Sequence, residues 1–355
     1  MNVFNGERFL REAIESILGQ RFPDFEFIAI DDGSTDETAA ILDAYAQKDS
    51  RLQVYQQENR GMSAANNRGC ALARGKYIAH LDADDVAMPD RLERQIAFLE
   101  NHEKVGLLGG AIEEIDHEGN PLLLRQLPLE DVSIRAAMQT LTPALFHPAV
   151  VMRKQAFDAT GGYRAQFLHA EDFDLFLCIM DRWKVANLPE VVTRRRIHAQ
   201  QISVRYVRQQ LFSVLGARAL AAARQRHEVE PPFPGPVISE GFLDQLGVSR
   251  DLRHRLLVGT YYYLIESMLQ NSQDDAVVGL VDELYNLSGS GPVGRSALSN
   301  ALLLAARIRY RQGQPFRASG SVARAVLTRP MVVGRPLKRA MTYLFRKSQP
   351  EIARP

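Results

Sequence analysis

The chain has 355 residues, of which 46% are hydrophobic and 24% are charged, and its formal net charge at pH 7 is +1. A chain of this length and composition can form one large α/β domain and a smaller second one. The nearly balanced charge argues against a protein that binds nucleic acid over its whole surface.

Other whole-chain features predict a protein of the reducing cytoplasm. The two cysteines, Cys70 and Cys178, stand far apart in apolar surroundings, as expected of small buried side chains and not of a disulfide framework. The N-terminus lacks the apolar run of a signal peptide. No stretch approaches the roughly 20 apolar residues that a membrane-spanning helix needs.

The first 200 residues alternate helical patterns with short apolar runs. Helical spacing predicts a helix over 9–18 with Asn5 as N-cap, and an apolar run predicts a strand over 25–30. Ser34 and Glu37 have the spacing of a capping box before the next helix. Further strands are predicted over 52–55, 76–81, 105–112 and 191–193, and further helices over 37–45, 63–74 and 89–99.

This alternation predicts an α/β fold with a Rossmann-like, mostly parallel sheet and helices on both faces. Ligands bind such sheets beyond the carboxyl ends of the strands, where the chain carries two acidic clusters. After residue 205 the pattern becomes helical. We therefore expect two domains, 1–205 and 206–355.

A basic tail with interleaved apolar residues runs from Arg329 to Lys347. Such a segment suits either peripheral contact with an anionic membrane surface or a solvated terminal helix, and both readings stay open.

The first acidic cluster, Asp82-Ala83-Asp84-Asp85, follows a predicted buried strand. Three carboxylates in four residues repel one another unless a cation or hydrogen-bond donors compensate them. Their hard oxygen atoms suit Mg²⁺ or Mn²⁺. The plainer alternative is a solvated acidic turn before the next helix.

Two acidic pairs extend the set of candidates. Asp31 and Asp32 also end a predicted strand, where a carboxylate can accept hydrogen bonds from a nucleotide base or ribose, or can cap the following helix. Glu171 and Asp172 open an apolar helix. Acids there suit the helix dipole, but they also suit a general base that takes a proton from a hydroxyl group.

Basic residues gather at 194–198, after the last predicted strand. Arg196 is a candidate to meet a phosphate, and His198 is a candidate to bind the metal. A single histidine is more often structural. Four arginine or histidine side chains in five positions nevertheless indicate an anion nearby.

In their order, these motifs resemble those of the family 2 glycosyltransferases of bacterial type, which have the GT-A fold. The likeness covers residues 2–205, and the C-terminal third shows no comparable match. The segments that carry it are Asn2–Leu10, Ile30–Asp36, Leu81–Asp85, His147-Pro148 with Gly161-Gly162-Tyr163 and Glu171-Asp172, and Arg196-Ile197-His198 with Ser203.

The resemblance implies a role for each candidate. Asn5 and Glu7 would belong to the nucleotide-binding turn, Asp32 would contact the base or ribose with Asp31 beside it, and Asp82 would contact the ribose or the donor sugar. Asp84 would hold Mn²⁺ or Mg²⁺ together with Asp85, and His198 would assist at the metal or diphosphate. Asp172 would be the catalytic base, supported by Glu171.

Two departures from the family pattern stand out. The family has an entire β-strand before the turn at Asn5, and a chain that begins at Met1 lacks most of it, so we expect Met1 to be an internal methionine. Asn66 stands where the family often has arginine, and Arg68 is expected to replace it at the donor phosphates.

The resemblance predicts an inverting enzyme that transfers a sugar from a UDP-, GDP- or dTDP-linked donor to a glycan or lipid-linked acceptor in cell-surface polysaccharide synthesis. It would act in the cytoplasm or at the inner face of the cell membrane, without nucleic acid. The main alternative is an N-terminally truncated, non-catalytic transferase-like binding module. A nucleotidyltransferase would need a glycine-rich phosphate loop near its first strand, and a P-loop NTPase needs G-x-x-x-x-G-K-[ST]; the chain has neither.

Overall fold

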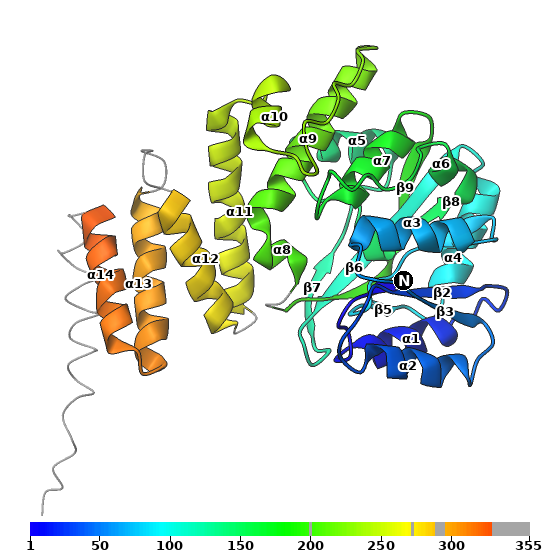
Figure 1. The fold of residues 1–355 in the computed structure, drawn as a ribbon, viewed down its shortest axis with the longest axis horizontal. Helices are drawn as coiled ribbons and strands as arrows, with labels where there is room; N and C mark the ends of the chain where they lie inside the picture. Colours follow the sequence, from blue (N-terminus) through cyan, green and yellow to red (C-terminus); the bar gives the residue numbers. More distant parts are fainter. Residues whose placement is uncertain (199–200, 271–272, 288–294, 329–355) are drawn as a thin grey trace, which may run out of the picture. The chain divides into compact units, whose positions relative to one another are not determined.

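A computed structural model describes residues 1–198, 201–270, 273–287 and 295–328 of the chain (Figure 1). These residues fall into two compact units, one from 1–198 and 208–250 and the other from the described residues within 199–207 and 251–355. Because residues 208–250 pack within the first unit, that unit continues beyond the boundary expected at residue 205.

A small parallel sheet begins the first unit, and its strand order is β1–β2–β3. Helices α1 and α2 lie along one face of it and α3 along the other (Figure 1). Its elements are β1 (Asn2–Val3), α1 (Leu10–Leu18), β2 (Phe27–Asp31), α2 (Thr38–Ala46), β3 (Leu52–Gln56) and α3 (Met62–Leu72). Leu10, Ile14 and Leu42 are fully buried against β2, which explains the predicted spacing.

The predicted helix caps are wrong. The N-cap of α1 is Phe9, which makes no side-chain cap. Asn5 lies earlier, in the left-handed region with φ of 52°. The N-cap of α2 is Glu37, and it too makes no side-chain cap. The Ser34 hydroxyl instead accepts the Asn5 N–H, so these polar side chains join two loops and do not close their own helices.

Before Asn5, the chain forms strand over two residues only. Ile30 donates its N–H to the carbonyl of Met1 at 3.0 Å, and Asp32 donates to the carbonyl of Val3 at 2.9 Å. A cavity of about 620 Å³ lies beside this short strand, lined by residues of β2, α3 and the next strand, β4 (Tyr77–Ala79). The first sheet and the second are therefore separate in the described residues.

The second sheet has the strand order β4–β8–β6–β9–β5, with β7 paired to β6. Its long central strands, β6 and β9, run parallel, and the other pairs are antiparallel. The remaining bounds are β5 (Val86–Ala87), β6 (Val105–Ile115), β7 (Pro121–Arg125), β8 (Val151–Arg153) and β9 (Lys184–Arg196). Val86 pairs with Arg194, so the acidic cluster just before β5 lies beside the end of β9.

Helices complete the first unit. The acidic residues Glu171 and Asp172 occupy the first turn of α7, whose side chains Leu175, Phe176 and Ile179 are buried in the core. The helices are α4 (Arg91–Asn101), α5 (Asp131–Thr140), the 3₁₀ turn η1 (His147–Ala149), α6 (Lys154–Asp158), α7 (Glu171–Met180), α9 (Val207–Gln225) and α10 (Glu240–Gln245). Cys70 is buried and Cys178 is half-buried, and both are free thiols as predicted.

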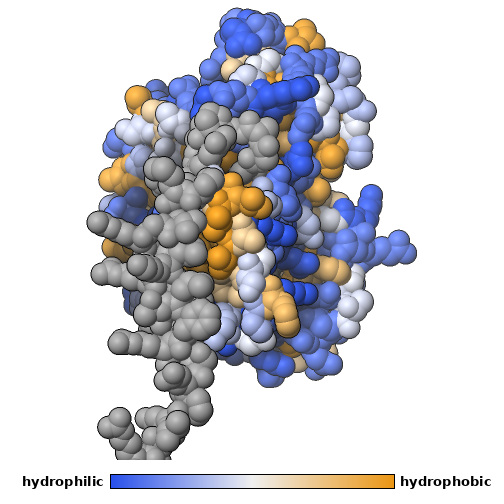
Figure 2. Space-filling model, turned by 90° about the vertical axis from the view of Figure 1, so that its left-hand side faces the viewer, coloured by the Kyte–Doolittle hydropathy of each residue, from blue (hydrophilic) through white to orange (hydrophobic). Residues whose placement is uncertain are grey.

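The described part of the second unit is helical, as expected for this part of the chain. Its helices are α8 (Ile202–Arg205), α11 (Arg250–Gln270), α12 (Asp274–Leu287), α13 (Arg295–Arg311) and α14 (Pro315–Thr328). Figure 2 shows a mostly hydrophilic face of the molecule, on which apolar side chains of the described residues gather in several places. The predicted basic tail lies outside the described residues. Among those that are described, no helix has the length and apolar character needed to cross a membrane.

Candidate functional site

The acidic loop, residues Asp82–Asp85, connects β4 to β5. Carboxylate oxygens of Asp82, Asp84 and Asp85 lie within 4.8 Å of one another. Burial and the two neighbouring carboxylates raise the pKa of Asp85 well above its ordinary value, because they oppose a further negative charge. A divalent cation with hard oxygen ligands would relieve this repulsion, so the three residues fit Mg²⁺ or Mn²⁺.

His198 joins the acidic loop from the end of β9. Its Nε2 lies 2.9 Å from Oδ2 of Asp84, and the centroid of its ring lies 5.4 Å from that of Phe9, the N-cap residue of α1. The structure thus brings together the side chains that the sequence assigned to the metal.

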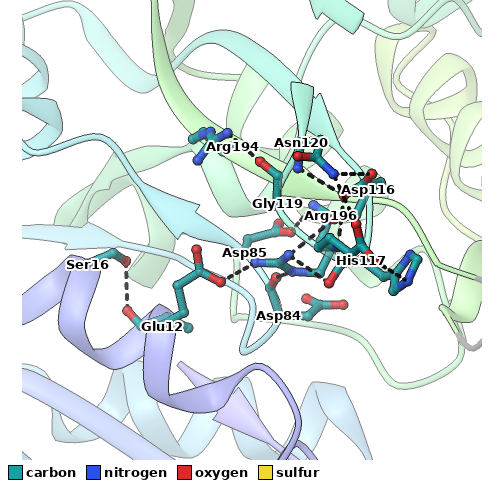
Figure 3. A network of polar contacts seen from close by, with 12 residues as sticks. Glu12, Ser16, Asp84, Asp85, Asp116, His117, Gly119, Asn120, Arg194 and Arg196 are labelled. Atoms are coloured by element: carbon teal, nitrogen blue, oxygen red, sulfur yellow. Dashed lines mark hydrogen bonds and ion pairs between the residues drawn. The ribbon is translucent and has the colours of Figure 1, made fainter. Parts of the chain in front are cut away.

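Arg196 was expected to meet a phosphate, but the structure gives its side chain a different use. The residue is only 2% exposed. Its guanidinium donates to the carbonyls of Asp84 and Asp116 and to the carboxylate of Glu12 (Figure 3). A phosphate would have to displace these protein partners.

The pair at the end of β2 organises the loops around it. Asp32 is buried and accepts three hydrogen bonds, from Gln57 Nε2 at 2.7 Å and from the N–H groups of Arg60 at 2.9 Å and Gly61 at 2.8 Å. Asp31 is buried as well, and its Oδ1 accepts the Ser34 N–H at 3.0 Å. Asp32 therefore shapes the 57–61 loop that borders the end of the sheet.

The opening turn, residues Asn5–Glu7 before α1, is tied to the loop that follows β2. Oδ1 of Asn5 accepts the Thr35 N–H at 2.8 Å, and Oε2 of Glu7 accepts the Glu37 N–H at 3.0 Å. Gly6 lies between them, where an added Cβ would stand 2.6 Å from a methyl group of Val3, so only glycine fits. The same Cβ position is 3.8 Å from Ala83, which places this turn beside the acidic loop.

The two α3 candidates make different contacts. Asn66 is buried and its Oδ1 accepts a hydrogen bond from Asn2, while its Nδ2 has no hydrogen-bond partner among the described residues. Arg68 donates to the carbonyl of Gln56 at 2.8 Å and lies over the ring of Tyr55. Arg68 therefore points toward the loop that Asp32 organises.

Glu171 and Asp172 form a second acidic group. Desolvation raises the pKa of Asp172 to about 6, although its side chain keeps some accessible surface. Burial, and then repulsion from Asp172, raises the pKa of Glu171 to about 8. The negative charge of Asp82 raises both pKa values further, so this pair lies within electrostatic range of the acidic loop.

A chain of contacts that sequence reasoning largely missed runs from the acidic loop to Tyr163, whose hydroxyl feels the charges of Glu171 and Asp172. His80 Nε2 lies 2.9 Å from Oδ1 of Asp82, and its ring stacks on that of His147 with centroids 3.6 Å apart. His147 Nε2 in turn lies 2.8 Å from the hydroxyl of Tyr163. Burial lowers the pKa of both histidines well below the ordinary value, so both are neutral at pH 7 and His80 donates its N–H to Asp82.

Arg91 is a second missed residue, and it fixes where His80 stands. Its buried guanidinium donates to the carbonyl of His80 at 2.7 Å and to those of Pro148 at 2.7 Å and Val150 at 3.1 Å. Through these hydrogen bonds, the guanidinium links the end of β4 to the segment before β8. In the sequence, the one sign of this role is that Arg91 stands next to the apolar face of the helix predicted over 89–99.

A stability measurement tests the environment of Glu171. The folded protein holds this proton up to about pH 8, whereas an ordinary glutamate releases it near 4.5. The resulting stabilisation is complete below the unfolded pKa and is lost as the pH rises through about 8. Glu171→Gln cannot ionise, so from about pH 5 to about pH 9 its melting temperature should fall less than that of the wild type. Parallel melting curves for the two proteins would contradict this environment.

Known proteins match part of this chain in sequence. A family model described as Glycosyl transferase family 2 matches residues 1–161. The putative glycosyltransferase EpsE of Bacillus subtilis is 34% identical over 203 residues, which cover 55% of this chain and 71% of that protein. The amylovoran biosynthesis glycosyltransferase AmsE of Erwinia amylovora is 31% identical over 209 residues, which cover 58% and 77%.

Solved structures match the fold. TarS (residues 1–349) of S. aureus in complex with UDP-GlcNAc has a TM-score of 0.54 at 20% identity, covering 88% of this chain and 90% of that chain. A mannosyltransferase of Pyrobaculum calidifontis in complex with GDP-Man and Mn²⁺ has a TM-score of 0.50 at 18% identity, covering 92% and 84%. These likenesses confirm the predicted GT-A fold.

Proposed function

Because the chain belongs to glycosyltransferase family 2, we propose that it is a metal-dependent, inverting enzyme that moves a sugar from a nucleotide-sugar donor to a glycan or lipid-linked acceptor. One observation carries the proposal. The proposed metal site, Asp82, Asp84, Asp85 and His198, lies within electrostatic range of an acidic pair in which Glu171 is buried and Asp172 has a pKa suited to a general base. Amylovoran biosynthesis by AmsE supports a role in polysaccharide synthesis.

The donor is proposed to lie across the ends of β2 and β4. Asn5, Glu7, Asp31 and Asp32 shape the loops that would receive the base and ribose, and Asp82 would contact the ribose or sugar. Arg68 is the cation of α3 nearest to these loops and is our candidate for a phosphate contact. The complexes of the two structural relatives with UDP-GlcNAc and GDP-Man support UDP or GDP as the carrier.

The metal would be held by Asp84 and Asp85 with help from His198. When bound, Mn²⁺ or Mg²⁺ would neutralise charge on the diphosphate leaving group. The carboxylate cluster fits such an ion, because the Arg196 N–H and the charge of Arg195 only partly offset the repulsion that Asp84 and Asp82 exert on Asp85. Buried, neutral His80 directs Asp82 by a hydrogen bond and adds no charge to the cluster.

Asp172 would act on the acceptor. The acceptor hydroxyl attacks the anomeric carbon as the bond from that carbon to the nucleoside diphosphate breaks, and the hydroxyl proton passes to Asp172. A single displacement inverts the anomeric configuration and needs no covalent intermediate. Since the pKa of Asp172 is about 6, it is mostly ionised at pH 7, while Glu171 is mostly protonated. We place the reaction in the cytoplasm or at the inner face of the membrane, with the lipid-linked or glycan acceptor.

A panel of donors tests the proposal. Binding and hydrolysis of UDP-, GDP- and dTDP-sugars would be measured with and without Mn²⁺. We expect one carrier to be hydrolysed slowly, and only with the metal. Failure of every carrier to bind would reject the enzyme and favour a transferase-like binding module.

A further inference from the structure

The end of β9 joins three segments that are far apart in the sequence, and Arg196 lies at their meeting point (Figure 3). We propose that Arg196 is a positioning residue, which holds the acidic loop in the shape that binds the divalent cation, and that it is not a ligand of the donor phosphates. This inference rests on the proposed function, because it takes the acidic loop to be the metal site.

Arg196 holds the acidic loop at two points. Its backbone N–H donates to Oδ1 of Asp85 at 2.7 Å, and its Nε–H donates to the carbonyl of Asp84 at 2.9 Å. The first contact orients a carboxylate, and the second fixes the backbone from which the Asp84 carboxylate extends. Nε2 of His198, two residues after Arg196, contacts the Asp84 carboxylate itself. One short segment therefore sets the direction of both aspartates.

The rest of the guanidinium anchors the loop to two further elements. Nη2 donates to the carboxylate of Glu12 on α1 at 2.5 Å, and Nη1 donates to the carbonyl of Asp116 at 3.1 Å in the β6–β7 turn. That turn is itself braced, since Oδ1 of Asp116 accepts the N–H groups of Glu118 at 2.8 Å and Asn120 at 2.9 Å. The acidic loop is thus held against a helix and a stiff turn.

These contacts leave Arg196 poorly suited to bind a phosphate. Its N–H groups point in three directions toward protein acceptors, and its guanidinium lies 4.6 Å from the ring of Phe9. Moving a buried cation away from its partners is costly. Residues that hold metal ligands in place commonly affect metal affinity without contacting the ion. We expect Arg196 to act in this way on the Mn²⁺ affinity of the acidic loop.

Arg194 provides a matched control on the same strand. Its side chain donates to the carboxylate of Glu113 at 2.8 Å and to the carbonyl of Gly119 at 2.8 Å. It therefore also links β9 to the β6–β7 region, but no described side-chain contact joins it to Asp84 or Asp85. Losing Arg194 removes a charge and a structural link while leaving the acidic loop in place.

The experiment measures Mn²⁺ binding to the full chain by the loss of the free-ion signal in electron paramagnetic resonance. Arg196→Ala is expected to raise the dissociation constant of Mn²⁺ by about 10- to 100-fold. Arg194→Ala should stay close to the wild type, and Arg196→Lys should recover only part of the affinity, because an ammonium group cannot span the three acceptor directions. In donor hydrolysis, raising Mn²⁺ should restore activity to Arg196→Ala.

The outcomes separate this inference from the proposed function. If the wild type binds Mn²⁺ and a folded Arg196→Ala binds it equally well, the positioning role is wrong and the metal site stands. If the wild type does not bind Mn²⁺, the metal site fails and the positioning role fails with it. Should Arg196→Ala not fold, Arg196→Lys and Glu12→Gln decide, and unchanged Mn²⁺ affinity in both would overturn the inference.

Discussion

Replacing Asp172 by asparagine is expected to lower turnover by about 10²- to 10⁴-fold, the usual contribution of a general base. Asparagine keeps the shape of the side chain and can still accept the Phe173 N–H hydrogen bond that Asp172 accepts at 2.7 Å. It cannot take up a proton from the acceptor. Binding of nucleotide and metal should therefore be nearly unchanged, because the loss lies in the chemical step.

The pH profile gives a second view of the same residue. Since burial raises the pKa of Asp172 to about 6, wild-type turnover should fall as the pH drops through this value. Asp158→Asn is the control for the loss of a carboxylate, because Asp158 is exposed and its one ion pair among the described residues is with Lys154 on α6. Wild-type turnover by Asp172→Asn would show that another group takes the proton.

Replacing Asp84 by alanine is expected to remove metal-dependent turnover. The variant would lose a proposed ligand of the cation, and a catalytic metal contributes several kcal/mol to transition-state stabilisation, so a fall of at least about 10²-fold in turnover is expected. Mn²⁺ affinity should fall in parallel, since Asp84 also carries the contact to His198. Isothermal titration with Mn²⁺ and a donor hydrolysis assay measure both effects.

Asp90→Ala is the control for this change, because Asp90 forms a surface ion pair with Arg94 just beyond the acidic loop. Loss of activity in Asp90→Ala as well would point to a general disturbance of the loop. Retained metal affinity in Asp84→Ala would instead move the metal to other carboxylates.

The sequence predicted the fold well where it depends on local periodicity. Strand β2 is a short apolar run, the apolar run predicted over 105–112 lies within the longer β6, and α1 carries its buried side chains Leu10 and Ile14 at helical spacing. The grouping of the acidic loop with His198 followed from the rule that ligands bind at the carboxyl ends of strands. The strands and helices can be predicted from the residue pattern of one segment at a time. The grouping of the acidic loop with His198 requires only that the topology of an α/β sheet is recognised.

The contacts of the site could not be predicted, because they depend on pairing between distant strands. His80 and His147 are 67 positions apart, and they stack only because β4 pairs with β8. In the sequence, the positive charge of Arg196 suggests a residue that binds phosphate. In the structure, its guanidinium is buried and donates hydrogen bonds to Glu12, Asp84 and Asp116. Charge can be read from a sequence, but the partner that satisfies it cannot.

The most direct test of the account compares metal-dependent release of nucleoside diphosphate by the wild type, Asp84→Ala and Asp172→Asn, using the donor that the panel identifies. We predict release by the wild type only with Mn²⁺, almost none by either variant, and normal binding of nucleotide and Mn²⁺ by Asp172→Asn. Release at the wild-type rate by Asp172→Asn, or by the wild type without a divalent cation, would contradict a metal-dependent transferase with Asp172 as its base.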